Sequence, residues 1–127
     1  MTSIKDGTSN TVAVGERPSY PSLPQAGYCG AWVYNEMDNA LGLPNTKQWC
    51  ATQDQNGNAC PGGNQWFQPG LSNNYCDANH YWSKHPGGGN WLFCDGSVHF
   101  LNYYIGTAIQ AALATKAGGE VIDASAF

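Results

Sequence analysis

The chain has 127 residues, a formal net charge of −4 and only 11% charged residues. This length suits one domain with a single core. So few basic residues exclude the positively charged face that binding to nucleic acids or anionic membranes requires. The chain shows no signal peptide, and no apolar run is long enough to cross a membrane. We therefore expect a single domain over residues 1–127 that binds neither nucleic acid nor membrane.

Two short strands are predicted in the first third of the chain. Residues 11–16 alternate weakly between apolar and polar side chains, as a half-buried strand does. The following loop holds three prolines between residues 17 and 27, which favour an extended path. Residues 28–34 predict a second strand, with Trp32 and Tyr34 on one face together with Tyr28. Trp32 is more suited to a core than to a ligand.

The middle of the chain, residues 35–80, has no sustained periodicity and is rich in Asn, Gln and Gly. A structureless stretch of this length in a small domain is often functional. Short strands are expected near residues 48–51 and 65–68. Neutral amides beside aromatic rings suit neutral, hydroxyl-rich ligands, although the same amides also populate ordinary loops.

A β-hairpin is the strongest local prediction. Asp95-Gly96 separates two apolar runs, which is typical of a two-residue type I′ turn. That turn would place Phe93 opposite Val98 and Trp91 opposite Phe100, and directly opposed residues share a face. The predicted core face is wholly apolar and the other is mixed. The core face holds Trp91, Phe93, Val98 and Phe100, and the mixed face holds Leu92, Cys94, Ser97 and His99.

A short helix is predicted near the C-terminus, where apolar side chains recur at helical spacing between Ile105 and Leu113. Gly118-Gly119 would end it, and Val121-Ile122 could add a last strand. The expected fold is mainly β: an antiparallel β-sandwich with long loops and one short C-terminal helix.

The five cysteines predict disulfides rather than a zinc site, because no pair has CxxC spacing. Cys94 lies inside a predicted strand and is expected to be a free, buried thiol. The other four allow three connectivities. Cys50–Cys60 is the best local pair, and Cys29–Cys76 follows by elimination. Disulfides indicate an exported protein, so the chain is expected to be a piece of a longer secreted one.

Three stretches of the sequence resemble one bacterial family. They are residues 4–11 with 14–16, residues 85–101, and residues 114–121. They are similar to the prepilin-processing-associated, pseudopilin-like domains named for an H-x9-D-G motif, which here runs from His85 to Asp95-Gly96. The resemblance leaves residues 35–79 uncovered. It implies a pseudopilin-like extracellular domain, although the leader and long apolar helix usual in that family are missing here.

The same terminal motifs, with the aromatic and amide-rich middle, also resemble a carbohydrate-binding module of family 81. That resemblance implies a β-sandwich that binds β-glucans without catalysis and is attached to a glycoside hydrolase in the parent protein. The glucans would be cellulose-type chains, mixed-linkage glucan or xyloglucan. The alternative function is a pilin-like extracellular structural or assembly subunit.

A glucan site needs exposed aromatic rings, each burying roughly 150–250 Å², together with hydrogen-bonding amides. The extended segment Tyr81-Trp82 should point its two rings opposite ways. The resemblance to the pseudopilin-like family implies that Trp82 is the exposed one. The alternative for every tryptophan is core packing. The expected ligand-binding residues are Trp82, Trp66, Trp49, Gln65, Gln68 and Asn79.

Catalysis is not expected. A Cys94–His99–Asp95 arrangement would lie on a hairpin without a pocket, and a glycosidase needs two positioned carboxylates. We expect no cofactor, although a structural calcium ion remains an option. Its ligands would come from loop carbonyls and from Asp6, Asp38, Asp54 or Asp77.

Overall fold

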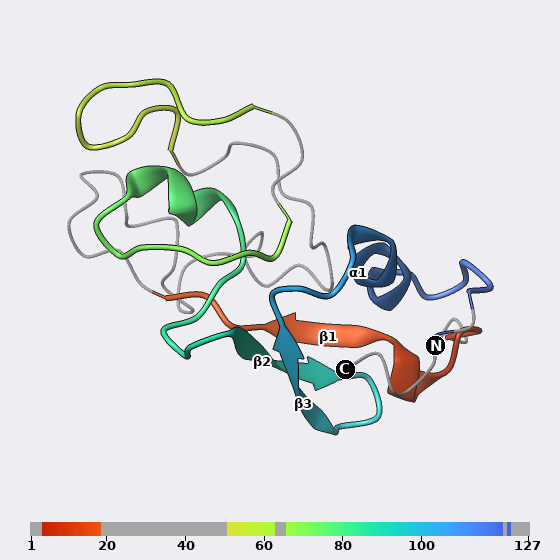
Figure 1. The fold of residues 1–127 in the computed structure, drawn as a ribbon. Coiled ribbons are helices and arrows are strands. Elements are labelled where there is room, and N and C mark those ends of the chain that lie inside the picture. Colours follow the sequence, from red (N-terminus) through yellow and green to blue (C-terminus); the bar gives the residue numbers. More distant parts are fainter. Residues whose placement is uncertain (1–3, 19–50, 63–65, 121, 123–127) are drawn as a thin grey trace.

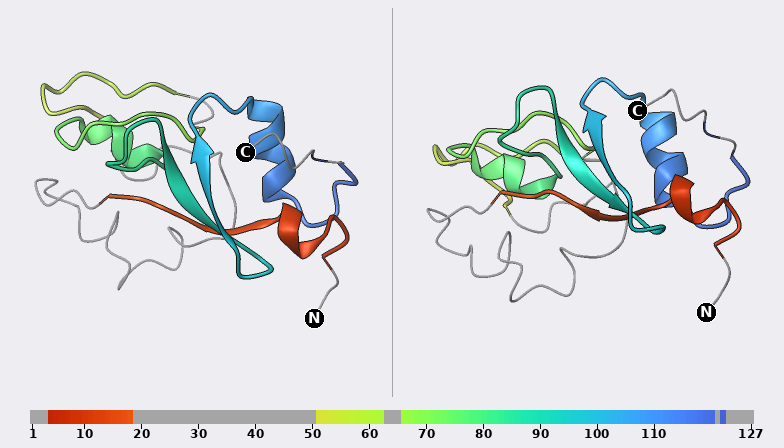
Figure 2. Two further views of the ribbon diagram at one scale, coloured as in Figure 1. Left: turned by 60° about the horizontal axis from the view of Figure 1, so that its bottom comes forward. Right: turned by 90° about the horizontal axis from the view of Figure 1, so that it is seen from below.

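The computed structural model describes residues 4–18, 51–62, 66–120 and 122 (Figure 1). Their centre is one antiparallel sheet with the strand order β1-β2-β3. Its strands are β1 (Val12–Gly15), β2 (Gly88–Phe93) and β3 (Val98–Asn102). The helices are η1 (Thr8–Asn10), η2 (Tyr75–Asn79) and α1 (Thr107–Ala114). Figure 2 shows η1 and α1 at one end of the sheet and residues 51–62 at the other.

This part of the chain therefore shows one small antiparallel sheet and one C-terminal helix. The prediction of residues 11–16 as a strand is confirmed by β1, and the predicted helix is confirmed by α1. The helix ends at Ala114 with Thr115 as its C-cap, so the prediction that Gly118-Gly119 ends it is wrong. The second sheet of the expected sandwich stays a prediction. The predicted strand at residues 28–34 lies outside the described residues, as do most of those near residues 48–51 and 120–127. Residues 66–68 are described and form no strand, so the strand expected near residues 65–68 is not found there.

The hairpin forms at the expected place, but the predicted register is wrong by one residue. Leu92 pairs with Val98 and Trp91 with His99. The Gly96 N–H donates to Phe93 O at 3.0 Å, and the Phe93 N–H donates to Ser97 O at 2.8 Å. Only Gly96 in this loop has a positive φ, of 89°. A type I′ turn needs positive φ at both Asp95 and Gly96, whereas a three-residue loop needs it only at the glycine.

The one-residue shift reverses the facing of β3, because successive strand residues point to opposite faces. Val98 is 62% exposed and Phe100 47% exposed, so the prediction of these two as core residues is wrong. Leu101 takes their place at 2% exposure, and Trp91 and Phe93 are buried as predicted.

Strand β1 pairs antiparallel with β2, with an irregularity between Val12 and Val14. Val12 lies in the core cluster, and Val14 lies on the other face of the sheet, opposite Leu92. Gly15 lies directly beneath the Trp91 ring, where an added Cβ would be 2.5 Å from a ring carbon. A side chain at this position would displace the ring that forms the centre of the core.

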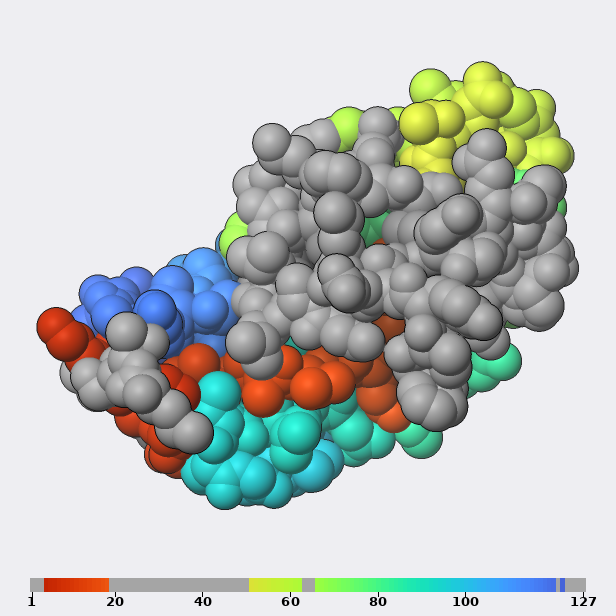
Figure 3. All heavy atoms as spheres, turned by 180° about the vertical axis from the view of Figure 1, so that it is seen from behind, coloured from red at the N-terminus to blue at the C-terminus, as the bar shows by residue number. Residues whose placement is uncertain are grey.

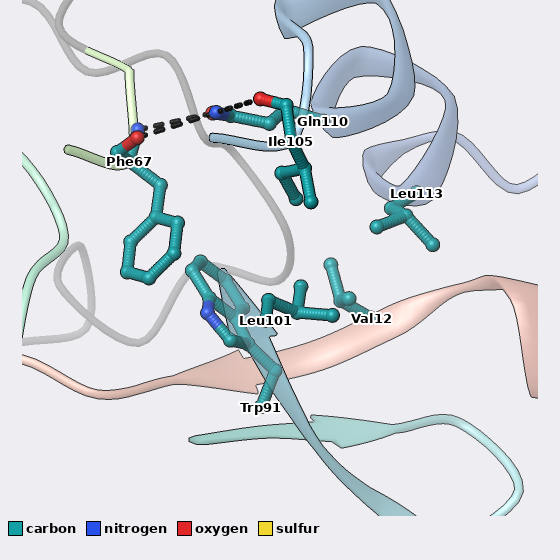
Figure 4. A pocket seen from close by; sticks show the side chains of 7 residues that line it. All are labelled: Val12, Phe67, Trp91, Leu101, Ile105, Gln110 and Leu113. Carbon is teal, nitrogen blue, oxygen red and sulfur yellow. Dashed lines mark hydrogen bonds between the residues drawn. The ribbon is translucent and has the colours of Figure 1, made fainter. Parts of the chain in front are cut away.

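Helix α1 packs on the inner face of the sheet through Leu113, which is 1% exposed. Its buried Gln110 binds the backbone of Phe67: Oε1 accepts from the Phe67 N–H at 3.1 Å, and Nε2 donates to Phe67 O at 3.2 Å (Figure 4). The residues between helix and sheet leave only about 10 Å³ free. That is about the least that one water needs, so this space is packed core and not a ligand site.

The observed disulfide differs from both predicted pairs. Cys60 bonds to Cys76, with Cα atoms 5.3 Å apart. This bond closes residues 51–62 onto η2, and Ala51 packs beside it. The pairs Cys50–Cys60 and Cys29–Cys76 are therefore wrong, because sequence proximity does not determine which Cα atoms come within bonding distance. Cys94 is a free thiol as predicted, but it is half-buried rather than buried.

Candidate functional site

Trp82 is buried, so the prediction that it forms an exposed platform is wrong. Its exposed fraction is 3%, and that of Tyr81 is 4%. The two residues lie in different core clusters, and both are covered. Tyr81 packs against Trp91, with ring centroids 5.2 Å apart, while Trp82 packs with Ala78. An added Cβ on Gly70 would be 2.6 Å from the Trp82 ring, so this glycine allows close contact.

Asn79 is a structural residue rather than an exposed hydrogen-bonding group. It is 1% exposed. Its amide donates to Ala51 O at 2.7 Å and accepts from the Ala51 N–H at 3.1 Å. It therefore holds the start of the 51–62 segment against η2, and the prediction that it contacts a ligand from the surface does not fit its position.

The remaining predicted ligand residues do not form one platform in the described structure. Trp66 is half-buried and Gln68 is exposed. Trp49 and Gln65 lie outside the described residues. The structure therefore does not bring the six predicted residues together.

A surface hollow of about 580 Å³ lies above the buried Trp82. Its volume is in the range of small-ligand sites. Tyr104 lies on it with 91% of its surface exposed. The Tyr103 hydroxyl accepts from the Ser83 N–H at 2.9 Å and thereby joins the two sides of the hollow. The lining residues are Pro69, Gly70, Leu71, Ser72, Trp82, Ser83, Lys84, His85, Pro86, Gly87, Tyr103 and Tyr104.

Sequence reasoning missed Tyr104 as a surface aromatic. The available signal was the Tyr103-Tyr104 pair directly after a predicted strand, where the structure has a turn. Tyr103 packs beside Phe67, with ring centroids 4.7 Å apart, and this leaves Tyr104 outside.

Asp6 joins the two ends of the described chain. Its carboxylate accepts from the Gly119 N–H at 2.9 Å and from the Gly118 N–H at 2.8 Å. The Thr115 hydroxyl donates to it at 3.3 Å. The Gly119 N–H is the largest cause lowering the pKa of this carboxyl below 3.8, because these bonds favour the charged form. The N-terminal and C-terminal motifs are thus two halves of one contact.

Asp95 has a similar role within the hairpin. Its Oδ1 accepts from the Ser97 hydroxyl at 2.6 Å and from the Ser97 N–H at 2.9 Å. The Ser97 hydroxyl is the main cause lowering the pKa of Asp95. His99 Nε2 lies 3.0 Å from the same hydroxyl. Serine therefore lies between aspartate and histidine, whereas a nucleophilic triad needs the histidine in the middle.

Glu16 connects β1 to the start of the hairpin motif. One carboxylate oxygen accepts from the Asn90 N–H at 2.6 Å, and the other lies 3.5 Å from His85 Nε2. The His85 ring therefore contacts the carboxylate directly after β1 rather than lying free on the surface. Asp6, Glu16, His85 and Asp95 therefore all have structural contacts.

Metal binding finds no support in the described part of the chain, where no group of three His, Cys, Asp or Glu side chains could hold an ion. Asp54 caps its own loop by accepting from the side chain and the N–H of Asn58, which lower its pKa. Asp77 accepts from the Leu71 N–H at 2.7 Å. Asp38 lies outside the described residues.

In the described ranges, no helix has both the length and the apolar character to cross a bilayer.

These features define a small sheet-and-helix domain in which the motif residues bind one another. A family model described as "Protein of unknown function (DUF1559)", SBP_bac_10, matches residues 1–107. The chain therefore belongs to this family, which is associated with H-x9-DG pseudopilin-like proteins. No curated protein and no solved structure matches the chain.

Proposed function

We propose that the chain is the non-catalytic extracellular domain of a pseudopilin-like structural or assembly subunit. The observation that supports this most is the use of the motif residues. Asp6, Glu16 and Asp95 all bind backbone N–H groups of the same domain. Contacts of this kind within the domain favour a structural role for these carboxylates. The motifs shared with the family therefore describe a scaffold.

The disulfide supports an exported location. Bonds such as Cys60–Cys76 persist in oxidising compartments and are rare in the cytosol. A domain of this size also gains stability from such a bond, because its single core is small. We propose that the domain works outside the cytoplasm.

The test is localisation of the tagged, full-length parent protein in its native host. We expect it in the fraction sheared from the cell surface. Asp6→Ala should reduce that surface fraction because it separates the chain ends, whereas Asp54→Ala, which loosens one local loop, should not. Recovery of the folded, unsubstituted protein only from the cytoplasm would refute the proposal.

A second candidate function is β-glucan binding at the hollow, with cellulose-type chains, mixed-linkage glucan or xyloglucan as ligands. The supporting observation is Tyr104, whose ring is almost fully exposed beside a ligand-sized depression. A sugar can stack its C–H face on such a ring while Ser72 and Lys84 offer hydrogen bonds to its hydroxyls. Attachment to a glycoside hydrolase in the parent protein belongs to this same proposal.

Affinity electrophoresis of the chain in gels containing mixed-linkage glucan or xyloglucan tests this second function. Losing one stacking ring costs about 1 kcal/mol, so Tyr104→Ala should weaken binding roughly fivefold. Trp66→Ala is the matched aromatic control and should change binding little. Loss of binding with Trp66→Ala alone would move the site away from the hollow, and absence of retardation in every gel would reject the function.

A further inference from the structure

Among the described strands β3 is an edge strand, and the backbone of Val98 and Phe100 faces outward from the sheet. The sheet order places β2 on one side of it and no described strand on the other. Hydrogen-bonded pairs alternate along an antiparallel ladder. The bonds from the Phe93 N–H to Ser97 O and from the Tyr103 N–H to Gly87 O set that alternation. The backbone N–H and C=O groups of Val98 and Phe100 must therefore point away from β2.

Both of these residues are accessible. Val98 is 62% exposed and Phe100 47% exposed. In Figure 3 the β2–β3 hairpin lies along the lower border of the molecule. Natural edge strands are commonly protected by a lysine, a proline, a bulge or an inward charge. β3 has the sequence Val-His-Phe-Leu-Asn and pairs with β2 without a register shift, so it has none of these protections.

We propose that β3 pairs antiparallel with β3 of a second copy of this chain. The register that uses the whole strand places Phe100 opposite Phe100 of the second copy. Val98 then lies opposite Asn102 of that copy. In this register the two Phe100 residues exchange both of their backbone hydrogen bonds. The Asn102 C=O already accepts from the Ile105 N–H at 3.2 Å and has a second lone pair for the Val98 N–H of the other copy. The interface is isologous, as in most closed two-fold dimers.

A second copy fits this edge better than an unrelated extended peptide because the contact is self-complementary in its side chains as well. The two Phe100 rings become directly opposed neighbours on one face, an arrangement that stabilises sheets. The same face continues through Val98 and Leu92 to Val14, all of them exposed. Like charges do not face each other across the interface between the two β3 strands, because β3 carries no acidic or basic side chain apart from the inward-facing His99.

The dimer rests on the proposed structural role for its biological meaning, and it identifies a second copy of the chain as the partner in that role. Analytical ultracentrifugation of the chain should show a monomer–dimer equilibrium as concentration rises to about 1 mM, the weak limit of specific association. Amide exchange at Val98 and Phe100 should slow with concentration. The amides of His99 and Leu101 already bond to β2 and should change little.

Phe100→Lys places two like charges at the two-fold axis and should abolish the dimer, with circular dichroism confirming the fold. Leu92→Lys is the matched control, since it puts the same charge on the same face but on the central strand, and it should keep most of the dimer. Val98→Pro removes an outward N–H that β2 does not use, and it should weaken association.

A monomer at every concentration would overturn the inference, as would open-ended oligomers or equal loss of the dimer in Leu92→Lys and Phe100→Lys. These results leave the proposed surface location intact if the parent protein is still found in the sheared fraction. A dimer that forms in solution from a protein confined to the cytoplasm would refute the proposed function alone.

Discussion

The substitution Gln110→Leu tests the contact that joins α1 to the segment before the hairpin. Gln110 is 5% exposed, and its side chain makes three hydrogen bonds. Two are with the Phe67 backbone, and the third runs from Nε2 to Ile105 O at 3.2 Å. Leucine has a similar size but no polar atoms. It would leave the N–H and C=O of the buried Phe67 without partners (Figure 4).

Each orphaned backbone group costs about 1–3 kcal/mol. The apolar leucine recovers about 1–2 kcal/mol through burial. When the cost of the two unpaired Phe67 groups is set against the gain from burying leucine, we expect Gln110→Leu to lower the free energy of unfolding by about 3 kcal/mol.

Urea unfolding followed by tryptophan fluorescence measures this change. Gln55→Leu is the matched control, because Gln55 is exposed and the same substitution there should stay within about 0.5 kcal/mol. A loss below about 1 kcal/mol for Gln110→Leu, at an unchanged slope, would refute the idea that this amide satisfies buried backbone.

Three further predictions concern the other contacts. Because the pKa of Asp6 is lowered in the folded state, its bonds stabilise the fold above pH 3.8, and this stability is lost as pH falls through the lower folded-state pKa. Asp6→Asn should therefore reduce the pH dependence of the free energy of unfolding in that range. An unchanged pH dependence would contradict this prediction. Replacing both Cys60 and Cys76 by alanine should cost about 3 kcal/mol in thermal unfolding, and an unchanged melting temperature would show that the bond is dispensable. Asp95→Gly should destabilise the hairpin by removing the bonds to Ser97, whereas stabilisation would indicate a type I′ turn after all.

Local sequence signals predicted the elements that depend on local physics. The alternation at residues 11–16 and the helical spacing from Ile105 to Leu113 correspond to β1 and α1. Asp95-Gly96 marked the turn correctly. Its type could not be read from the dipeptide, because Asp-Gly suits both a two-residue loop and a three-residue loop with glycine in the left-handed region.

The candidate site was less predictable, because exposure is a property of neighbours distant in the chain. Trp82 is covered where Gly70 allows its ring to approach, and Asn79 is used by Ala51, 28 residues earlier. Tyr104 is exposed because Tyr103 takes the inner position. The contacts that bury Trp82 and Asn79 have no signature within a few residues of either side chain.

The sequence by itself determined the hairpin location, the strand before it, the helix after it, and the motifs that place the chain in its family. These depend on backbone preference and on the spacing of apolar residues, which act over a few positions. Only the tertiary structure decided the register of β3, the Cys60–Cys76 bond and the burial of Trp82. Each of these depends on which residues distant in the chain pack against one another. Packing selects one arrangement from several that local backbone preferences favour equally.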